Sequence, residues 1–265
     1  MSNLSLTKVK RCCESLSGIE TVYVFERLAS TNQTLWDLID QGAPMGSVAI
    51  AAEQTAGRGQ WGRQWLSSVG GLYLSWALAP HLPVANSAQL TLCSAWGIVR
   101  ALRDRHIPVQ IKWPNDLILA GHKLGGILTE TRVQQGVITK AAIGVGINWA
   151  NPVPDTGINL QTFLADRPTP VFPTLESLAV VVLTGLLTGY QQFQQQGIEA
   201  LLPNYLELLD SLGHPVSIAG DPGVVVGITP TNELRVQLQR DRSNSSSEIC
   251  LKPGTISLGY RNKNE

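Results

Sequence analysis

The sequence has few charged residues and no excess of either sign. Charged residues make up 15% of the 265 residues, and 20 Lys plus Arg balance 20 Asp plus Glu. General nucleic-acid binders usually carry a net basic surface, so this balance argues against wholesale electrostatic attraction to DNA or RNA. A local basic patch is still compatible with it. The apolar content of 43% is that of a globular chain with a real core.

The chain also lacks a long apolar run. The longest one, residues 178–187, is interrupted by Thr184 and Gly185 and is too short to cross a bilayer. Residues 1–18 have a basic start but no apolar segment of the kind that secretory signals carry. We therefore expect no membrane segment, no membrane partner and a cytoplasmic location.

Cysteine and histidine are too few and too scattered for a metal cluster or a hydrolase triad. The adjacent Cys12 and Cys13 do not have metal-ligand spacing, and reduced structural thiols explain the cysteines. A site must then rely on arginine, lysine, amides and backbone N–H groups. Such groups stabilise phosphates and developing negative charge better than they perform acid–base chemistry at neutral pH.

Up to about residue 165 the pattern predicts a sheet with flanking helices. Ser30 and Gln33 form a capping box before a helix whose apolar stripe ends at Gly42. Several strands follow one another through short turns, so we expect largely antiparallel pairing. The predicted strands are residues 21–25, 47–52, 71–79, 107–113, a hairpin over 117–130, and 141–149, and the first long helix is 87–105.

After about residue 165 the character of the sequence changes. A proline-punctuated linker, 166–174, leads into two successive helices that meet near residue 197. Short strands separated by turn residues follow, and they predict a small β-barrel. We therefore expect one domain over 1–212 and a second over 213–265. The strands expected in the second are 215–219, 223–230, 233–239, 248–254 and 255–260.

The segment 57–63, Gly-Arg-Gly-Gln-Trp-Gly-Arg, combines three glycines with two arginines. Glycine lets a backbone wrap closely around a ligand, and arginine supplies a permanent planar charge suited to phosphate or carboxylate. No Gly-Lys-Ser/Thr ends the segment and a strand follows it, so it is neither a Walker A loop nor a Rossmann fingerprint. It predicts an anion site, with a flexible surface loop or a short nucleic-acid contact as alternatives.

The segment 112–116, Lys-Trp-Pro-Asn-Asp, ends a predicted strand. Alternation puts Lys112 on the face opposite Trp113, and the proline places Asn115 and Asp116 at the strand tip. An amide there can read the edge of a purine, and a carboxylate can hold Mg²⁺. A plain Pro-Asn-Asp turn is the alternative.

Two glycine-containing strands complete the candidate set. Lys123 precedes Gly125 and Gly126 and an apolar strand, so its ammonium can point into a site while the backbone stays close to a ligand. A solvated hairpin lysine is the alternative. The segment 144–149, Gly-Val-Gly-Ile-Asn-Trp, ends an apolar strand with an amide.

Taken together and in this order, these segments resemble the biotin–protein ligase family. The resemblance covers about residues 20–165, with a similar small C-terminal barrel after it. A single motif of this kind would be weak evidence, whereas the ordered set at plausible spacing is highly specific. The matching segments are 30–32, 53–59, 112–116, 123–128 and 144–148.

The resemblance implies a fold and a reaction. The fold is α+β: a mixed, largely antiparallel sheet with flanking helices, like that of class II aminoacyl-tRNA synthetases, followed by an SH3-like barrel. The reaction uses ATP and Mg²⁺ to convert biotin into biotinyl-5′-AMP and pyrophosphate. A lysine of a biotin carboxyl carrier domain of a carboxylase then takes the biotinyl group and releases AMP. Relatives can dimerise through sheet edges, so the resemblance leaves a homodimer open.

The resemblance also implies roles for individual residues. Arg58 and Lys123 would be the catalytic cations, bracketing the junction of carboxylate and phosphate. Asp116 would be the metal ligand. The biotin site would comprise Ser30, Thr31, Asn32, Gln54, Arg58, Gly59, Gln60, Lys123 and Gly126, and the ATP site Arg58, Trp61, Arg63, Lys112, Asn115, Lys123 and Asn148.

The sequence departs from the family in two ways. Related loops commonly read Gly-Arg-Gly-Arg, whereas Gln60 stands at the second arginine position here. Some relatives also carry an N-terminal winged helix and repress transcription. Only about twenty residues precede the first predicted strand, so we expect a ligase without DNA binding.

Three other functions compete with this interpretation. A lipoate–protein ligase shares the fold and a catalytic lysine, but the segments 112–116 and 57–59 favour biotin. A non-catalytic biotin or nucleotide sensor would not need both Arg58 and Lys123. A general RNA-binding module does not fit the charge balance.

Overall fold

The computed structural model describes residues 5–165, 174–238 and 247–260. In these ranges an eight-stranded sheet has the order β1-β2-β3-β8-β7-β6-β5, and β4 pairs with β8 beside that path. Every pair of neighbours is antiparallel except β1–β2, which is parallel because a helix connects the two strands. The predicted mixed, largely antiparallel sheet is confirmed. Its strands are β1 (Val22–Leu28), β2 (Val48–Gln54), β3 (Leu72–Leu78), β4 (Leu82–Pro83), β5 (Gln110–Lys112), β6 (Asp116–Leu119), β7 (His122–Gln134) and β8 (Val137–Ile147).

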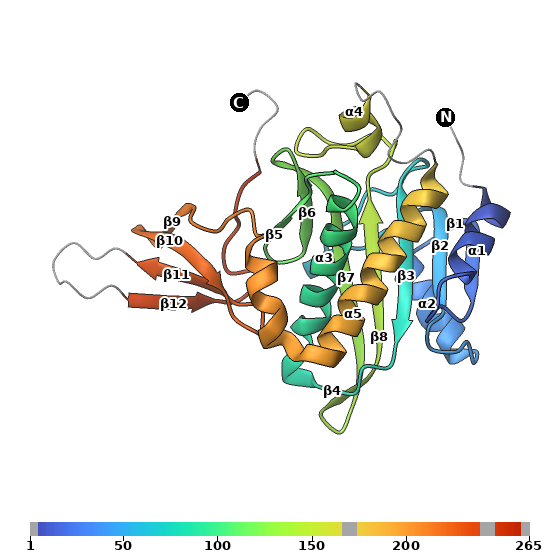
Figure 1. Cartoon of the computed structure of the whole chain (residues 1–265), viewed down its shortest axis with the longest axis horizontal. Coiled ribbons are helices and arrows are strands. Elements are labelled where there is room, and N and C mark those ends of the chain that lie inside the picture. Colours follow the sequence, from blue (N-terminus) through green and yellow to red (C-terminus); the bar gives the residue numbers. More distant parts are fainter. Residues whose placement is uncertain (1–4, 166–173, 239–246, 261–265) are drawn as a thin grey trace.

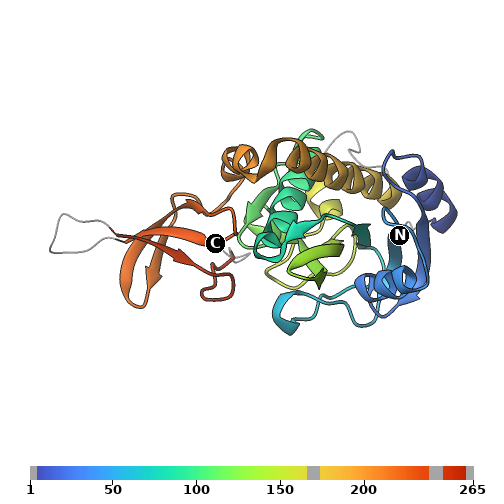
Figure 2. The same cartoon turned by 90° about the horizontal axis from the view of Figure 1, so that it is seen from below.

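Helices cover both faces of this sheet, as Figures 1 and 2 show. The helices α3 (Ala88–Arg103) and α5 (Leu175–Leu206) lie side by side against one face. The helix α2 (Thr31–Asp40) lies against the other face, where alanines of β2, β3 and β8 leave room for its apolar stripe. The short elements are α1 (Leu6–Glu14), which packs on α5 and β1, α4 (Leu160–Leu164), and the 3-10 turns η1 (Gln60–Gly62) and η2 (Val84–Asn86).

Glycines bring the backbones of α3 and α5 into direct contact. A Cβ atom added to Gly185 would lie 2.6 Å from the carbonyl oxygen of Gly97 and 2.8 Å from the Cα of Ile98. One added to Gly189 would lie 2.2 Å from the carbonyl oxygen of Cys93. Real Cβ atoms do not approach backbone atoms so closely, so these positions require glycine. The apolar run noted in the sequence therefore belongs to a buried helix.

The C-terminal part forms a separate four-stranded antiparallel sheet in the described residues, of order β12-β11-β10-β9. It lies at the β5 end of the large sheet (Figure 1) and is tied to it through Asn232. The indole Nε1 of Trp113 donates to the Asn232 carbonyl oxygen at 2.9 Å, and the Asn232 amide donates to the Pro114 carbonyl oxygen at 3.1 Å. The division into domains 1–212 and 213–265 stays a prediction. The strands are β9 (Pro215–Ile218), β10 (Asp221–Ile228), β11 (Leu234–Leu238) and β12 (Ser247–Leu251).

Two local predictions were wrong. Residues 255–260 belong to neither sheet, although their burial alternates with the period of two that suggested a strand. Here the alternation arises because Ile256 and Leu258 pack against the hydrophobic core and Tyr260 against Lys112, while the residues between them are exposed. Ser30 does occupy the N-cap of α2, but its side chain caps no backbone N–H, and Gln33 instead donates to Asp37 at 2.9 Å.

The structure also bears on the helix junction, the cysteines and the linker that the sequence analysis described. The predicted junction between two helices falls inside α5, where Gly197 has a φ of 76°. All four cysteines lie in the described ranges and are unpaired thiols. Within the same ranges, no helix has both the length and the apolar character needed to cross a membrane. The linker residues 166–173 lie outside the described residues.

Candidate active site

The face of the sheet under α2 carries several predicted site residues in one row. Lys112 of β5 pairs with Asp116 of β6, Asp116 with Gly126 of β7, and Gly126 with Gly146 of β8. Paired residues of neighbouring strands point to the same face, so the register of the sheet brings distant motifs together.

The glycines of β8 create the space above this row. A Cβ atom on Gly146 would lie 2.4 Å from the Nε1 of Trp65, and one on Gly144 would lie 2.5 Å from the Oδ1 of Asn32. Only the absence of side chains lets the Trp65 ring and the start of α2 lie directly on the strand. The motif Gly-Val-Gly therefore provides the base of a site, with Val145 buried toward the opposite face.

A cavity of about 330 Å³ lies on this face, a size in the range of small-molecule sites. Loop 57–65, the start of α2, the tip of the β5–β6 turn and residues 254–260 enclose it. The structure brings together nearly every predicted site residue there. Those that line the cavity are Ser30, Thr31, Asn32, Gln54, Arg58, Gly59, Gln60, Trp61, Arg63, Lys112, Asn115, Asp116, Lys123 and Gly126.

The cavity is strongly electropositive although the chain as a whole is neutral. Among the described residues that line it, four side chains are cationic and the only carboxylate is that of Asp116. The cations are Arg58, Arg63, Lys112 and Lys123, from three different parts of the chain. A partly enclosed site with this excess attracts an anionic ligand much more strongly than an exposed surface would.

Among these cations, Lys123 contacts both Asp116 and Trp65. Its Nζ is 2.7 Å from the Oδ1 of Asp116 and 5.3 Å from the centre of the Trp65 ring. The side chain of Lys123 is 29% exposed and that of Asp116 13%. The hydroxyl of Tyr260 donates to the other oxygen of Asp116, and burial raises the pKa of Tyr260, so the phenol stays protonated.

Lys112 lies deeper, with 5% of its surface exposed. Burial lowers the pKa of its ammonium to about 8. Its Nζ lies 3.1 Å from the centre of the Tyr260 ring, whose face attracts a cation. Lys112 is thus held between the sheet and the C-terminal segment, and its charge changes within an accessible pH range.

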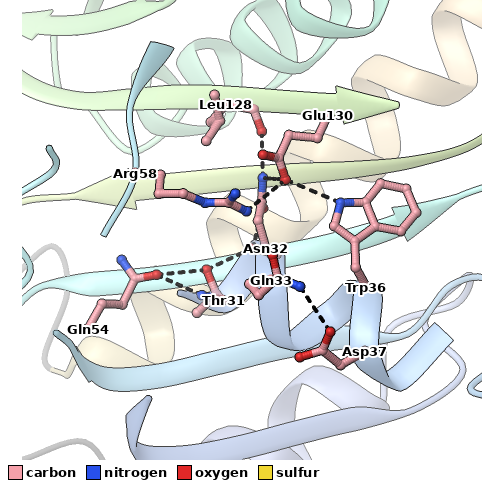
Figure 3. Close-up of polar contacts among 10 residues, drawn as sticks. Thr31, Asn32, Gln33, Trp36, Asp37, Gln54, Arg58, Leu128 and Glu130 are labelled. Atoms are coloured by element: carbon pink, nitrogen blue, oxygen red, sulfur yellow. Dashed lines mark hydrogen bonds and ion pairs between the residues drawn. The ribbon is translucent and has the colours of Figure 1, made fainter. Parts of the chain in front are cut away.

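A network of polar side chains lies at the α2 end of the cavity, shown in Figure 3. The carbonyl oxygen of the Gln54 side chain accepts from the backbone N–H of Thr31 at 2.8 Å and from its hydroxyl at 3.1 Å. Ser75 donates to the Oδ1 of Asn32 at 2.6 Å. These groups are fixed in place, and the Ser30 hydroxyl, which caps no backbone N–H of α2, faces the cavity beside them.

Loop 57–65 is closed on itself by backbone hydrogen bonds. The N–H of Gly59 donates to the Arg63 carbonyl oxygen at 2.7 Å, and the N–H of Trp65 donates to the Gly57 carbonyl oxygen at 2.9 Å. Trp61, at the tip, has a φ of 55° and is 54% exposed. The indole lines the cavity, with the guanidinium carbon of Arg63 5.6 Å from the centre of its ring.

Two predicted residues have other contacts. Asn148 does not line the cavity, because its side chain donates to the Lys123 carbonyl oxygen at 3.4 Å and accepts from Asn151 at 3.0 Å. It supports the backbone that carries Lys123. Asn115 lines the cavity while its amide donates to the Ile127 carbonyl oxygen at 2.7 Å.

Asp116 is a poor candidate for a metal ligand. Lys123 and Tyr260 occupy its two oxygens. In the described residues no group of three or more His, Cys, Asp or Glu could hold a metal ion. The residues present therefore do not fit a metal ion held by the protein alone.

Three residues that interact with the charged groups of the site were not singled out from the sequence. Trp65 and Tyr260 line the cavity, and Glu130 binds Arg58 just outside it. A second tryptophan in a glycine-rich loop was a usable signal for Trp65. Tyr260 lies 144 residues from its partner Asp116, so no local pattern could connect the two.

This chain is similar to known proteins that are described as ligases. The biotin/lipoate A/B protein ligase family matches residues 24–148. The bifunctional ligase/repressor BirA of Escherichia coli K12 is 32% identical over 230 residues, which cover 85% of this chain and 70% of that protein. The protein of the same name from Bacillus subtilis is 38% identical over 143 residues, 52% of this chain, and the match spans 44% of its length.

A solved structure agrees with the fold. A biotin protein ligase from Aquifex aeolicus, in complex with biotin and ATP, superposes with a TM-score of 0.69. The match covers 88% of this chain and 100% of the other, at 23% sequence identity. At that identity the likeness shows that the arrangement of helices and strands is shared.

Proposed function

The chain belongs to the biotin/lipoate A/B protein ligase family, and on that premise we propose that it is a biotin–protein ligase. Biotin and MgATP would give biotinyl-5′-AMP and pyrophosphate, and the biotinyl group would pass to a lysine of a biotin carboxyl carrier domain. The observation that carries the proposal is the electropositive cavity on a glycine base, which suits a reaction between two anions.

In the first step a carboxylate oxygen of biotin attacks the α-phosphorus of ATP, and the bond to the bridging oxygen of pyrophosphate breaks. Lys123 and Arg58 would lie on either side of the approaching oxyanions and reduce their repulsion. Arg63 would meet the β- and γ-phosphates, with Trp61 covering the nucleotide. Lys123 would leave Asp116 for the ligand, which the flexible lysine stem permits.

The biotin ring would occupy the α2 end of the cavity. Ser30 offers a hydroxyl there, and Thr31 and Gln54 retain hydrogen-bonding capacity beyond the bonds between them. Mg²⁺ would enter bound to the phosphates of ATP, since the described residues include no carboxylate cluster for it. In the second step the carrier lysine attacks the acyl carbon, AMP leaves, and the amine loses a proton.

The deciding experiment is ATP–pyrophosphate exchange with biotin, with lipoate and with neither. Exchange that requires biotin supports the proposal. Exchange with lipoate alone would assign the chain to the lipoate branch of its family. No exchange with either acid would refute adenylation and favour a binding protein without catalysis.

With Gln60 the protein should retain the adenylate less tightly than it would with an arginine at this position. The buried Oε1 of Gln60 lines the cavity and has no hydrogen-bond partner in the described residues. Replacing it with arginine adds a fifth cation beside the anionic intermediate, so Gln60→Arg should slow release of biotinyl-5′-AMP, by about tenfold for one charged hydrogen bond. Release is followed after mixing with excess unlabelled adenylate. Equal release rates for the two proteins would contradict this interpretation.

Lys112 should make ATP use depend on pH. Its ammonium is charged below about pH 8 and neutral above it. Because kcat/KM reports the ionisation of the free enzyme, kcat/KM for ATP should fall as pH rises through about 8. Lys112→Met should give a low and flat profile over the same range, and a profile unchanged by Lys112→Met would contradict the assignment.

The same ionisation affects stability in the opposite sense. The pKa of Lys112 is lower in the folded protein than the ordinary value of 10.5. The unfolded chain therefore binds more protons at this residue between the two values, so its contribution to stability rises with pH there. The ionisation of Lys112 does not destabilise the fold as the pH rises, so unfolding from this cause cannot explain the expected loss of kcat/KM. Thermal melts recorded at each pH would check this.

A further inference from the structure

Glu130 occupies the face of β7 that carries the cavity. Gly126, Leu128 and Glu130 alternate on that face, and the first two line the cavity while Glu130 lies just beyond it. Its side chain is 27% exposed. Glu130 is thus a carboxylate next to a site whose chemistry requires positive charge.

One oxygen of Glu130 accepts three hydrogen bonds. The amide of Asn32 donates to Oε2 at 3.1 Å, the indole of Trp36 at 3.2 Å, and the guanidinium of Arg58 at 3.1 Å (Figure 3). The first two donors belong to α2 and are buried, with exposures of 3% and 7%. They fix the carboxylate, and the fixed carboxylate in turn holds Arg58.

A second contact keeps the Trp36 donor in place. The guanidinium carbon of Arg132 lies 4.4 Å from the centre of the Trp36 ring, and Arg132 forms an ion pair with Asp40 of α2. The indole is therefore packed against a cation while its N–H points at Glu130. The anchor for Arg58 is rigid, whereas Arg58 itself is 41% exposed at its side chain.

We infer that Glu130 is a positioning residue for the adenylation step, acting through Arg58. The inference rests on the proposed function. Glu130 keeps the Arg58 guanidinium beside the biotin end of the cavity, so that its remaining N–H groups are oriented when carboxylate and phosphate arrive. Without this carboxylate the Arg58 side chain would sample many rotamers. Each incoming substrate would then have to fix the conformation of Arg58 itself.

A double-mutant cycle between Glu130 and Arg58 tests the inference. Glu130→Gln keeps the shape of the side chain but removes its charge, and we expect kcat/KM for biotin in pyrophosphate exchange to fall about tenfold. In an Arg58→Ala background the same change should have less than about a twofold effect, because the residue it acts through is gone. Equal losses in both backgrounds, or no loss in either, would overturn the inference.

Glu248→Gln is the matched control. It makes the same change of side chain and removes another Glu–Arg ion pair, that of Glu248 with Arg235 between β12 and β11, which line no part of the cavity and do not contact Arg58. If Glu130 acted only through the stability of the protein, both variants would lower activity in proportion to thermal stability. We expect Glu248→Gln to leave kcat/KM for biotin unchanged.

A measurement without substrates separates this inference from the proposed function. Nitrogen-15 NMR of the Arg58 guanidinium, assigned with Arg58→Lys, reports hindered rotation of its N–H groups. We expect hindered rotation in the unmodified protein and in Glu248→Gln, and free rotation in Glu130→Gln. Free rotation in the unmodified protein would refute the role of Glu130 even if exchange requires biotin. Absence of exchange in the unmodified protein would instead refute the proposed function.

Discussion

Replacing Lys123 with glutamine should lower biotin-dependent pyrophosphate exchange by ten- to a hundredfold or more. A hydrogen bond from a charged group contributes about 1.5–3 kcal/mol, and each 1.36 kcal/mol of barrier is a factor of about ten in rate. Lys123 has this large effect because it lines the cavity and its ammonium would lie between two groups that repel each other. The loss should appear in kcat, since the repulsion is greatest in the transition state.

Lys10→Gln is a suitable control for this experiment. Lys10 is a half-exposed lysine of α1, whose ion pair with Glu14 is long at 3.9 Å. Its removal changes the net charge of the protein by the same amount, without affecting the cavity. Exchange rates of Lys123→Gln equal to those of the unmodified protein would exclude Lys123 from the reaction.

Alanine at position 185 should lower the free energy of unfolding by about 1–3 kcal/mol, or more. An alanine in a helix is normally favoured over glycine by about 0.5–1 kcal/mol. Helix propensity alone would therefore predict that the substitution stabilises the protein, whereas we expect it to destabilise the protein. The reason is that the new Cβ atom would lie 2.6 Å from the Gly97 carbonyl oxygen, and no rotamer change can move backbone. The helices α3 and α5 would have to separate, which opens the core beneath them.

Thr184→Ala gives the matched comparison on the same helix. Thr184 is the exposed neighbour of Gly185, and its hydroxyl only donates to the Val180 carbonyl oxygen at 2.8 Å. Its removal should change stability by less than about 0.5 kcal/mol. Denaturant unfolding of both variants measures the difference. A Gly185→Ala protein as stable as the unmodified one would show that the two helices are not in backbone contact.

The sequence predicted most of the large sheet because each element there carries a local signal. Strands of period two and helices of period 3.6 end at glycine or proline, and their order follows from short turns. Many of the residues that line the cavity could be proposed from the sequence because they lie in short motifs, at strand ends, at the start of α2 and in the loop 57–63. The register then brought Lys112, Asp116 and Gly126 into one row.

The errors share a physical cause, namely contacts between residues distant in the chain. Ser30 has the pattern of a capping box, but its hydroxyl faces the cavity. Residues 255–260 have the alternation of a strand because Ile256 and Leu258 pack against the hydrophobic core. In the sequence, Glu130 has the pattern of an ordinary strand residue. Only the fold shows that its carboxylate lies 3.1 Å from the guanidinium of Arg58, 72 residues away.

The position of residues 254–260 over the cavity has a consequence for the order in which the protein is made. Most of the lining is supplied by residues 30–146, and the four cations of the site lie in that range. The covering segment is synthesised only after α5 and the second sheet. The ring above Lys112 and the phenol that binds Asp116 both belong to Tyr260, so they are among the last parts of the site to be made. The enclosed site is therefore complete only when nearly all of the described residues have been synthesised.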